Sequence, residues 1–186
     1  MERKDDGGRK AKAGPSALNL RGMELTDEGK YAKAVAAFSE ALETEPGNAS
    51  LLYNRGEALR RAGRVAEAEA DLLKVLDIEG ESADLMLALG LVAYESDNYE
   101  LAEERYRKAI ALRESYPEAW DNLGVIYFRS GKYDEAKTAF EKAVALDPRF
   151  ADAWFNLRDT YDELGLKRER DRAAARLRDL SARDSD

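Results

Sequence analysis

Apolar and small residues recur along the chain at helical spacing, in pairs of segments separated by short turns. In residues 117–150, Trp120, Leu123 and Tyr127 fall on one face of a first helix. The same stretch then places on one face of a second helix Tyr133, Ala136, Phe140, Ala143 and Val144. Turns are expected near Gly29, Gly63, Asp97, Gly131 and Gly165. The pattern predicts an all-helical chain built from hairpins.

The hairpins repeat with a fixed period. Gly22, Gly56, Gly90 and Gly124 are each separated by 34 residues, with no insertion or deletion. A period of this size indicates a repeat array, in which a single hairpin cannot bury its own apolar face and stacking completes the core. The predicted units are residues 15–48, 49–82, 83–116, 117–150 and 151–184.

Small residues mark where the two helices of a unit should cross. The eighth place of the first four units is glycine, and the twentieth place is Ala34, Ala68, Ala102 and Ala136. Only small side chains allow helix axes to approach to about 8–10 Å. Large residues are expected to fill the space beside them, namely Phe38, Leu72, Tyr106 and Phe140.

The fifth unit departs from this pattern toward charge. Arg158 and Arg170 stand where the other units have Gly and Ala, and Ala174 stands in the place of the large residue. Arg178 replaces the aliphatic series Leu42, Leu76, Ile110 and Val144. Terminal repeats need a polar outer face. We therefore expect this unit to cap the array, with its last helix over roughly residues 166–181.

The period resembles that of the tetratricopeptide repeat (TPR) family over nearly all of the chain after Ala13. In the fourth unit, the family's signature places hold Trp120, Leu123, Gly124, Tyr127, Gly131, Tyr133, Ala136, Phe140, Ala143 and Pro148. The resemblance implies an all-α, right-handed α-solenoid of five helix-turn-helix hairpins. It also implies a non-enzymatic scaffold or adaptor that binds a partner protein or peptide in its concave groove.

In similar proteins the groove is lined by the first helix of each unit, at the second, fifth, sixth, ninth, twelfth and thirteenth places. The apolar and aromatic residues at these places are Tyr53, Leu87, Leu91, Tyr94, Val125, Phe128 and Phe155. Leu87 and Leu91 lie one turn apart and are predicted to form an exposed apolar patch, which would mark a binding site. Aromatic residues at the fifth and twelfth places can instead pack between repeats, so both roles remain possible.

Asparagine occupies the sixth place three times, as Asn54, Asn122 and Asn156. In similar proteins this amide bonds the backbone of an extended peptide, using its donor and its acceptor. The alternative is that asparagine is simply the usual family residue there, and the sequence does not decide between the two.

Charge at the groove positions narrows the class of partner. These positions hold three arginines and ten carboxylates. The predicted acidic rim consists of Asp84, Glu118, Asp121 and Asp152. A basic, amphipathic partner segment fits this surface. The co-chaperone subgroup of the family grips an acidic chaperone tail with Lys, Asn, Asn, Lys and Arg. Here those places hold Asn19, Met23, Asn54, Asp84 and Ala88, so no heat-shock chaperone clamp is expected.

Composition excludes several other classes. The chain is 44% hydrophobic and 37% charged, with net charge −8. Residues 1–14 and 165–186 each carry +2, so residues 15–164 carry −12 and should repel nucleic acid. No apolar run is long enough for membrane insertion, and residues 1–14 lack the apolar stretch of a secretory signal. Residues 1–14 are predicted to form a disordered arm. We expect the protein to be cytoplasmic.

Residues for catalysis are scarce. The chain has no histidine, no cysteine and no phosphate-binding loop motif, so we expect no enzyme activity, no cofactor and no metal. The alternative to an adaptor is a self-associating assembly protein, joined through the Leu87–Leu91 patch. The expected oligomeric state is a monomer or a weak dimer.

Overall fold

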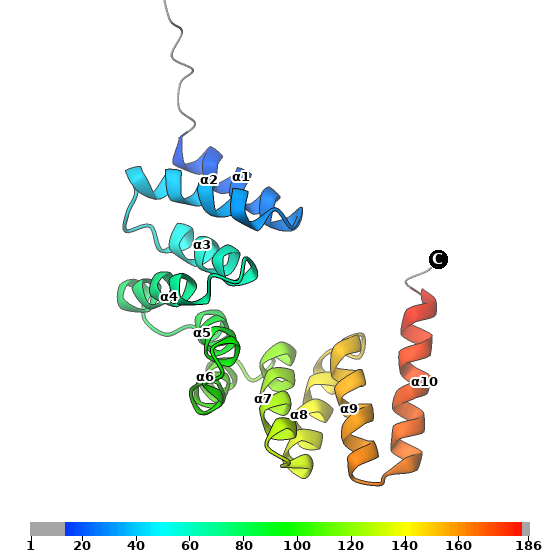
Figure 1. Cartoon of the computed structure of the whole chain (residues 1–186). Helices are drawn as coiled ribbons and strands as arrows, with labels where there is room; N and C mark the ends of the chain where they lie inside the picture. Colours follow the sequence, from blue (N-terminus) through cyan, green and yellow to red (C-terminus); the bar gives the residue numbers. More distant parts are fainter. Residues whose placement is uncertain (1–13, 184–186) are drawn as a thin grey trace, which may run out of the picture. The chain divides into compact units, whose positions relative to one another are not determined.

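The computed structural model describes residues 14–183, and these form ten helices and no strand (Figure 1). The first five helices are α1 Pro15–Asp27, α2 Tyr31–Thr44, α3 Ala49–Arg61, α4 Val65–Glu79 and α5 Ala83–Glu95. The remaining five are α6 Tyr99–Leu112, α7 Pro117–Arg129, α8 Tyr133–Leu146, α9 Ala151–Glu163 and α10 Lys167–Arg183. The predicted all-α class with five hairpins is confirmed. The predicted arm, except Gly14, lies outside the described residues.

The chain divides into two compact units. The first ends at Ile78, within the last turn of α4, and the second begins at Glu79. In the first unit, α1 packs on α2, and both contact α3. In the second unit, the hairpins α5–α6, α7–α8 and α9–α10 follow one another, with α6 packed on α7 and α8 packed on α9. Each hairpin therefore has a neighbour that covers its apolar face.

The predicted turns lie between the helices of each hairpin. Gly29, Gly63, Gly131 and Gly165 have φ between 69° and 74°, the left-handed region that glycine adopts without steric cost. The equivalent residue of the third hairpin is Asp97, at φ 57°. Asp97 is the one residue other than glycine with positive φ among the described residues. Aspartate tolerates this region better than most side chains because it bonds locally.

The helix crossings follow the predicted pairing of glycine with a large side chain. A Cβ atom built on Gly90 would lie 2.5 Å from the Tyr106 ring, and one on Gly124 would lie 2.6 Å from the Phe140 ring. These two rings are 0% and 1% exposed. The alanines at the twentieth place, Ala34, Ala68, Ala102 and Ala136, are all fully buried. The absence of side-chain atoms on glycine is what allows the ring to lie against the facing helix.

The last hairpin ends the second unit with a polar surface. Its final helix, α10, buries Ala173 and Leu180 against the rest of the unit, while Arg178 is exposed. Arg170 forms ion pairs with Asp162 and Asp171, at 2.8 and 2.9 Å. Arg178 is thus exposed and Arg170 pairs with carboxylates of its own hairpin, as a terminal repeat requires, while Arg176 donates to the Pro148 carbonyl oxygen of the fourth repeat.

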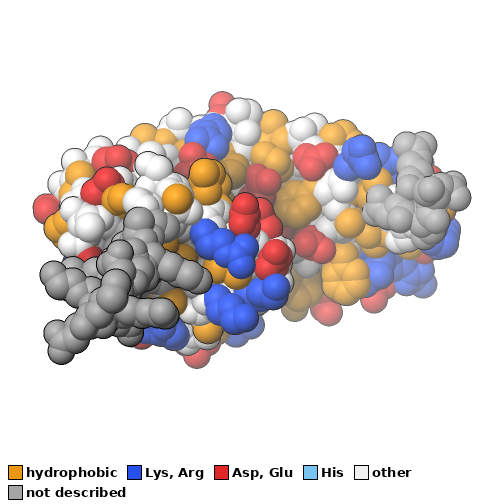
Figure 2. All heavy atoms as spheres, turned by 90° about the horizontal axis from the view of Figure 1, so that it is seen from above, with side chains coloured by type: hydrophobic (Ala, Val, Ile, Leu, Met, Phe, Trp, Pro, Cys, Tyr) orange, Lys and Arg blue, Asp and Glu red, His pale blue; other side chains and the backbone are white. Residues whose placement is uncertain are grey.

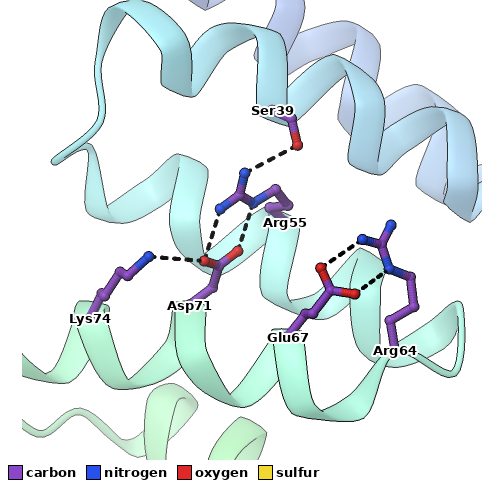
Figure 3. A network of polar contacts seen from close by, with 6 residues as sticks. All are labelled: Ser39, Arg55, Arg64, Glu67, Asp71 and Lys74. Atoms are coloured by element: carbon purple, nitrogen blue, oxygen red, sulfur yellow. Dashed lines mark hydrogen bonds and ion pairs between the residues drawn. The ribbon is translucent and has the colours of Figure 1, made fainter.

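A buried ion pair replaces aliphatic packing inside the first unit (Figure 3). Arg55 on α3 donates two hydrogen bonds to the Asp71 carboxylate on α4, at 2.6 and 2.9 Å, and a third to Ser39 on α2. Asp71 is 3% exposed. The places equivalent to Arg55 in the later repeats hold Leu89, Leu123 and Leu157. The charges therefore join three helices at a place where leucine packs in the later repeats.

None of the helices within residues 14–183 is both long enough and apolar enough to span a membrane.

The contact at Gly90 predicts a difference between two glycine substitutions. Gly90→Ala should destabilise the protein by about 1–3 kcal/mol, because the new methyl group overlaps a buried ring. Gly56→Ala should change stability by less than about 1 kcal/mol, since its Cβ lies 3.1 Å from the flexible Leu72 side chain and alanine favours the helix. Urea denaturation followed by circular dichroism measures both. Equal effects would contradict the proposed crossing geometry.

The ion pair in Figure 3 predicts a double-mutant result. Asp71→Ala should cost about 3 kcal/mol, because it strands the Arg55 guanidinium in a largely buried site. The double variant Arg55→Leu, Asp71→Ala should recover most of this loss, since it restores leucine packing. The control is Glu67→Ala, which breaks the exposed pair with Arg64 and should cost less than about 0.5 kcal/mol. A double variant no more stable than Asp71→Ala would show that the charges are needed for folding.

Candidate functional site

The predicted groove residues divide between the two units. Tyr53 and Asn54 lie on α3 in the first unit. The other eight lie in the second unit, on the first helices of its three hairpins: Leu87, Leu91, Tyr94, Asn122, Val125, Phe128, Phe155 and Asn156. The second unit also holds the four predicted rim carboxylates. It is therefore where a partner surface can be built from adjacent residues.

The Leu87–Leu91 patch is less exposed than the sequence predicted. Both leucines are half-buried and pack against the core of the second unit, as do Tyr94, Val125 and Phe128. The large exposed side chain among the predicted groove residues is Phe155, which is 48% exposed. The guanidinium of Arg158 lies 4.2 Å from the centre of the Phe155 ring. The exposed aromatic surface thus lies on α9 rather than on α5.

The three sixth-place asparagines all use their amide nitrogens within the chain. Asn54 donates to the Asn19 side chain at 3.1 Å, and Asn156 donates to the Asp121 carboxylate at 2.9 Å. In both cases the acceptor is the fifth-place residue of the preceding repeat, 35 positions earlier. For Asn122 that residue is Leu87, which has no acceptor. Asn122 instead donates to the Glu118 carbonyl oxygen of its own helix. Asn54 and Asn156 therefore link neighbouring repeats, a role that the 35-residue spacing could have revealed, whereas Asn122 does not.

The prediction that Asp121 belongs to the exposed rim is wrong. Asp121 is only 8% exposed, because α9 covers it and Asn156 bonds its carboxylate. The pKa of Asp121 is raised to about 6, chiefly by burial and in part by the nearby charges of Asp152 and Glu118, while the bond from Asn156 opposes the rise. Glu118 and Asp152 are themselves exposed. The rim is therefore two exposed carboxylates over a buried third.

Asp84 is also different from the free rim charge that was predicted. Its carboxylate accepts two hydrogen bonds from Arg113, at 3.0 and 2.6 Å, and one from the Tyr116 hydroxyl at 2.9 Å. The bonds from Arg113, then from Tyr116, hold the pKa of Asp84 below its usual value. Asp84 thus anchors the loop between α6 and α7 to α5, and its charge is already balanced.

A pocket of about 80 Å³ lies among α7, α8 and α9. Its apolar lining is Val125, Phe128 and Phe140, and its polar lining is Asn156 and Asp159. Phe140 belongs to the crossing with Gly124, so the helix contact that organises the hairpin also forms a wall of the pocket. The sequence pattern pointed to three of the five lining residues as partner-binding positions. Phe140 was predicted only as core, and Asp159 only as a groove charge.

Two aromatic rings contact Arg129, which follows the pocket residue Phe128 in the sequence. The Arg129 guanidinium lies 4.5 Å from the centre of the Tyr99 ring and 5.7 Å from that of Tyr94. Arg129 also donates to the Tyr99 hydroxyl at 2.7 Å, and this hydroxyl in turn donates to Asp97. The residue with unusual backbone geometry, Asp97, thus holds Tyr99 in place under Arg129. Glycine at that turn has no side chain and could not accept this hydrogen bond from Tyr99.

One face of the molecule carries charges of both signs (Figure 2). On the face drawn in Figure 2, acidic and basic side chains lie among hydrophobic ones. Within residues 14–183, no three carboxylates are placed so that they could hold a metal ion.

Comparison with known families agrees with the hairpin geometry. The family described as "Tetratricopeptide repeat" matches the chain twice, over residues 19–84 and over residues 117–150. The description "TPR repeat" matches residues 90–131. Together these matches include most of the described chain.

The chain belongs to the tetratricopeptide repeat family.

Solved structures of TPR proteins are similar to it over most of their length. MamA is 25% identical, with a TM-score of 0.74, covering 88% of this chain and 96% of its own. YrrB, described as a TPR protein with an unusual peptide-binding site, is 25% identical, with a TM-score of 0.65 and coverage of 88% and 84%. PilF from Pseudomonas aeruginosa is 20% identical, with a TM-score of 0.81 and coverage of 89% and 76%. No curated protein matches the chain by sequence.

The environment of Asp121 predicts a pH-dependent effect on the stability of this TPR protein. The pKa in the folded chain is about 6, above the usual value of 3.8, so the folded state binds the proton more tightly than the unfolded state. Proton binding at Asp121 therefore stabilises the folded state. This stabilisation is fully present below about pH 4 and is lost as the pH rises through about 6. Asp121→Asn removes the charge and keeps an acceptor for Asn156. It should stabilise the protein by about 1–3 kcal/mol at pH 7.

Denaturation of the variant and the wild type across the pH range measures this effect. The difference should shrink as the pH falls from about 7 to 4, where the wild-type carboxyl becomes neutral. Asp179→Asn, which removes an exposed carboxylate on α10, is the control and should show no such trend. A stability difference that does not vary with pH would mean that Asp121 is not a buried charge in solution.

Proposed function

We propose that this TPR chain is a non-enzymatic scaffold whose second unit binds an extended, basic and aliphatic segment of a partner protein. The binding surface consists of Leu87, Leu91, Tyr94, Val125, Phe128 and Phe155 on α5, α7 and α9, which we call the partner surface. The observation that carries the proposal is a pocket on this surface with an apolar lining and fixed polar edges. Such pockets are the usual form of binding sites in proteins.

The apolar part of the surface supports a role in affinity. Phe155 is the most exposed of the predicted groove residues, and aromatic side chains with a polar surround dominate binding energy at interfaces. The half-buried leucines and Phe128 are held by the core behind them, so they lose little freedom when a partner covers them. The likeness to YrrB, a TPR protein with a peptide-binding site, is consistent with this use of the surface.

The charge of the partner follows from the carboxylates that have no ion pair. Within residues 14–183, no lysine or arginine forms an ion pair with Glu118, Asp121 or Asp152. By contrast, Asp84 is neutralised by Arg113. Lysine or arginine on a partner segment would therefore meet uncompensated negative charge on α7 and α9.

The chain itself offers little for catalysis. The sequence has neither histidine nor cysteine, the side chains used most often as general base and as thiol nucleophile. The carboxyl whose pKa is most clearly raised among the acidic groups, Asp121, is buried under α9 and bonded by Asn156. Its environment suits the joining of two repeats, so we assign the second unit to binding alone.

Short fluorescein-labelled peptides test the proposal. Peptides that alternate lysine or arginine with leucine or valine should bind, whereas matched peptides with glutamate in place of the basic residues should not. Phe155→Ala should weaken binding by about tenfold, because a half-exposed aromatic anchor is lost. Raising the salt from about 0.05 to 0.5 M should weaken binding of the basic peptides, since exposed charges are screened.

The control is Leu146→Ala, which removes a side chain of similar exposure (42%) from α8, outside the partner surface. It should leave affinity unchanged. Light scattering over a range of protein concentrations separates the proposal from self-association. A dimer that dissociates on Phe155→Ala, together with no peptide binding, would overturn the proposal and favour an assembly role.

A further inference from the structure

We infer that the pocket among α7, α8 and α9 is the site for one branched aliphatic side chain of the partner segment, with a lysine or arginine of the same segment over Glu118 and Asp152. This inference rests on the proposed function and specifies which residues the partner segment must carry. Five residues define the pocket: Val125, Phe128, Phe140, Asn156 and Asp159.

The size of the pocket selects the side chain. Its volume is about 80 Å³, whereas an apolar cavity of about 150 Å³ is known to hold a benzene molecule. The pocket therefore suits an isopropyl or isobutyl group better than an aromatic ring. Three of the five lining residues are apolar, so the site favours a hydrocarbon group over water. Valine, leucine and isoleucine are the side chains that meet both conditions.

The walls of the pocket are held in place before any partner arrives. Phe140 cannot move toward α7 because it already lies against the backbone of Gly124. The Phe128 ring packs edge-on against Tyr133, with 5.3 Å between ring centres. A rigid wall of this kind reduces the entropy that binding costs.

The polar edge of the pocket is fixed in the same way. Asn156 is held by its bond to Asp121, and Asp159 accepts two hydrogen bonds from Arg158, at 2.8 and 2.6 Å. Both groups therefore have defined positions beside the pocket. An amide and a carboxylate at the edge of an apolar site suit the backbone N–H groups that flank a buried side chain.

The carboxylates near the pocket determine which residue of the partner segment should lie beside the aliphatic one. Asn156 lines the pocket and is bonded to Asp121, and the charges of Asp152 and Glu118 act on Asp121. The pocket is thus linked through Asn156 to Asp121, which lies within electrostatic reach of the exposed Glu118 and Asp152. A long, flexible cation next to the aliphatic residue would reach them, while the pocket itself receives no charge.

Substitutions at one residue can move the size preference in opposite directions. Val125→Met adds atoms to the pocket and should remove its capacity for leucine. Val125→Ala enlarges it and should improve binding of a peptide in which phenylalanine replaces leucine. Each variant is compared with three otherwise identical basic peptides that carry leucine, alanine or phenylalanine at a single position. Circular dichroism and thermal unfolding establish that each variant is folded.

For the wild-type protein, replacing leucine by alanine in the peptide should weaken binding by roughly ten- to fifty-fold, as expected for a buried isobutyl group. In Val125→Met the same replacement should change affinity by less than about twofold, because the pocket is already filled. The double variant Glu118→Gln, Asp152→Asn should lower the advantage of lysine over norleucine beside the anchor, without altering the preference for leucine.

The outcomes separate this inference from the proposed function. If the basic peptides bind and require Phe155, but the leucine-to-alanine loss is the same in wild type and Val125→Met, the pocket is not the anchor site and the scaffold role stands. If phenylalanine binds the wild type as well as leucine does, the size argument is wrong. If none of the basic peptides binds, the proposed function fails and the inference fails with it.

Discussion

The contact on which the hairpins depend is between a glycine in the first helix and a large side chain sixteen residues later. At Gly90 and Gly124 the ring of Tyr106 or Phe140 occupies the volume that a Cβ atom would need. Glycine weakens a helix by about 1 kcal/mol relative to alanine, so the contact must return at least as much through close packing. The fifth repeat shows the reverse arrangement. Arg158 replaces the glycine and Ala174 replaces the large residue, so bulk lies on the first helix instead of the second.

A second constraint is the link between successive first helices. Asn54 and Asn156 each reach back 35 residues to the fifth place of the preceding repeat. In the second unit this link has a chemical cost, since the acceptor is a carboxylate buried without a positive partner. The charges of Glu118 and Asp152 also act on this carboxylate, so the link between the two repeats lies in a region of negative charge.

Ion pairs occupy different kinds of position in the two units. In the first unit, Arg55 stands where the later repeats have leucine, and its ion pair with Asp71 ties α3 to α4. In the second unit, comparable charges stand at edges: Arg113 holds Asp84, and Arg158 holds Asp159. Charges that are paired in this way set positions rather than attract partners. The carboxylates of Glu118 and Asp152 differ because no lysine or arginine within residues 14–183 forms an ion pair with them.

The helices, the turns and the hairpin crossings could all be predicted from the amino-acid pattern, because each depends on residues that lie within one 34-residue period. Gly90 and Tyr106 are close enough in sequence for periodicity to place them together, and the positive φ at Gly29 or Gly131 follows from a local turn. The exposure of individual groove residues could not be predicted in this way, because it depends on what the next hairpin covers. Tertiary structure buried Asp121 under α9, paired Asp84 with Arg113 and packed Leu87 against the core. It also left a pocket beside Val125, since the space between three helices is set by how their side chains meet, and a period does not encode that.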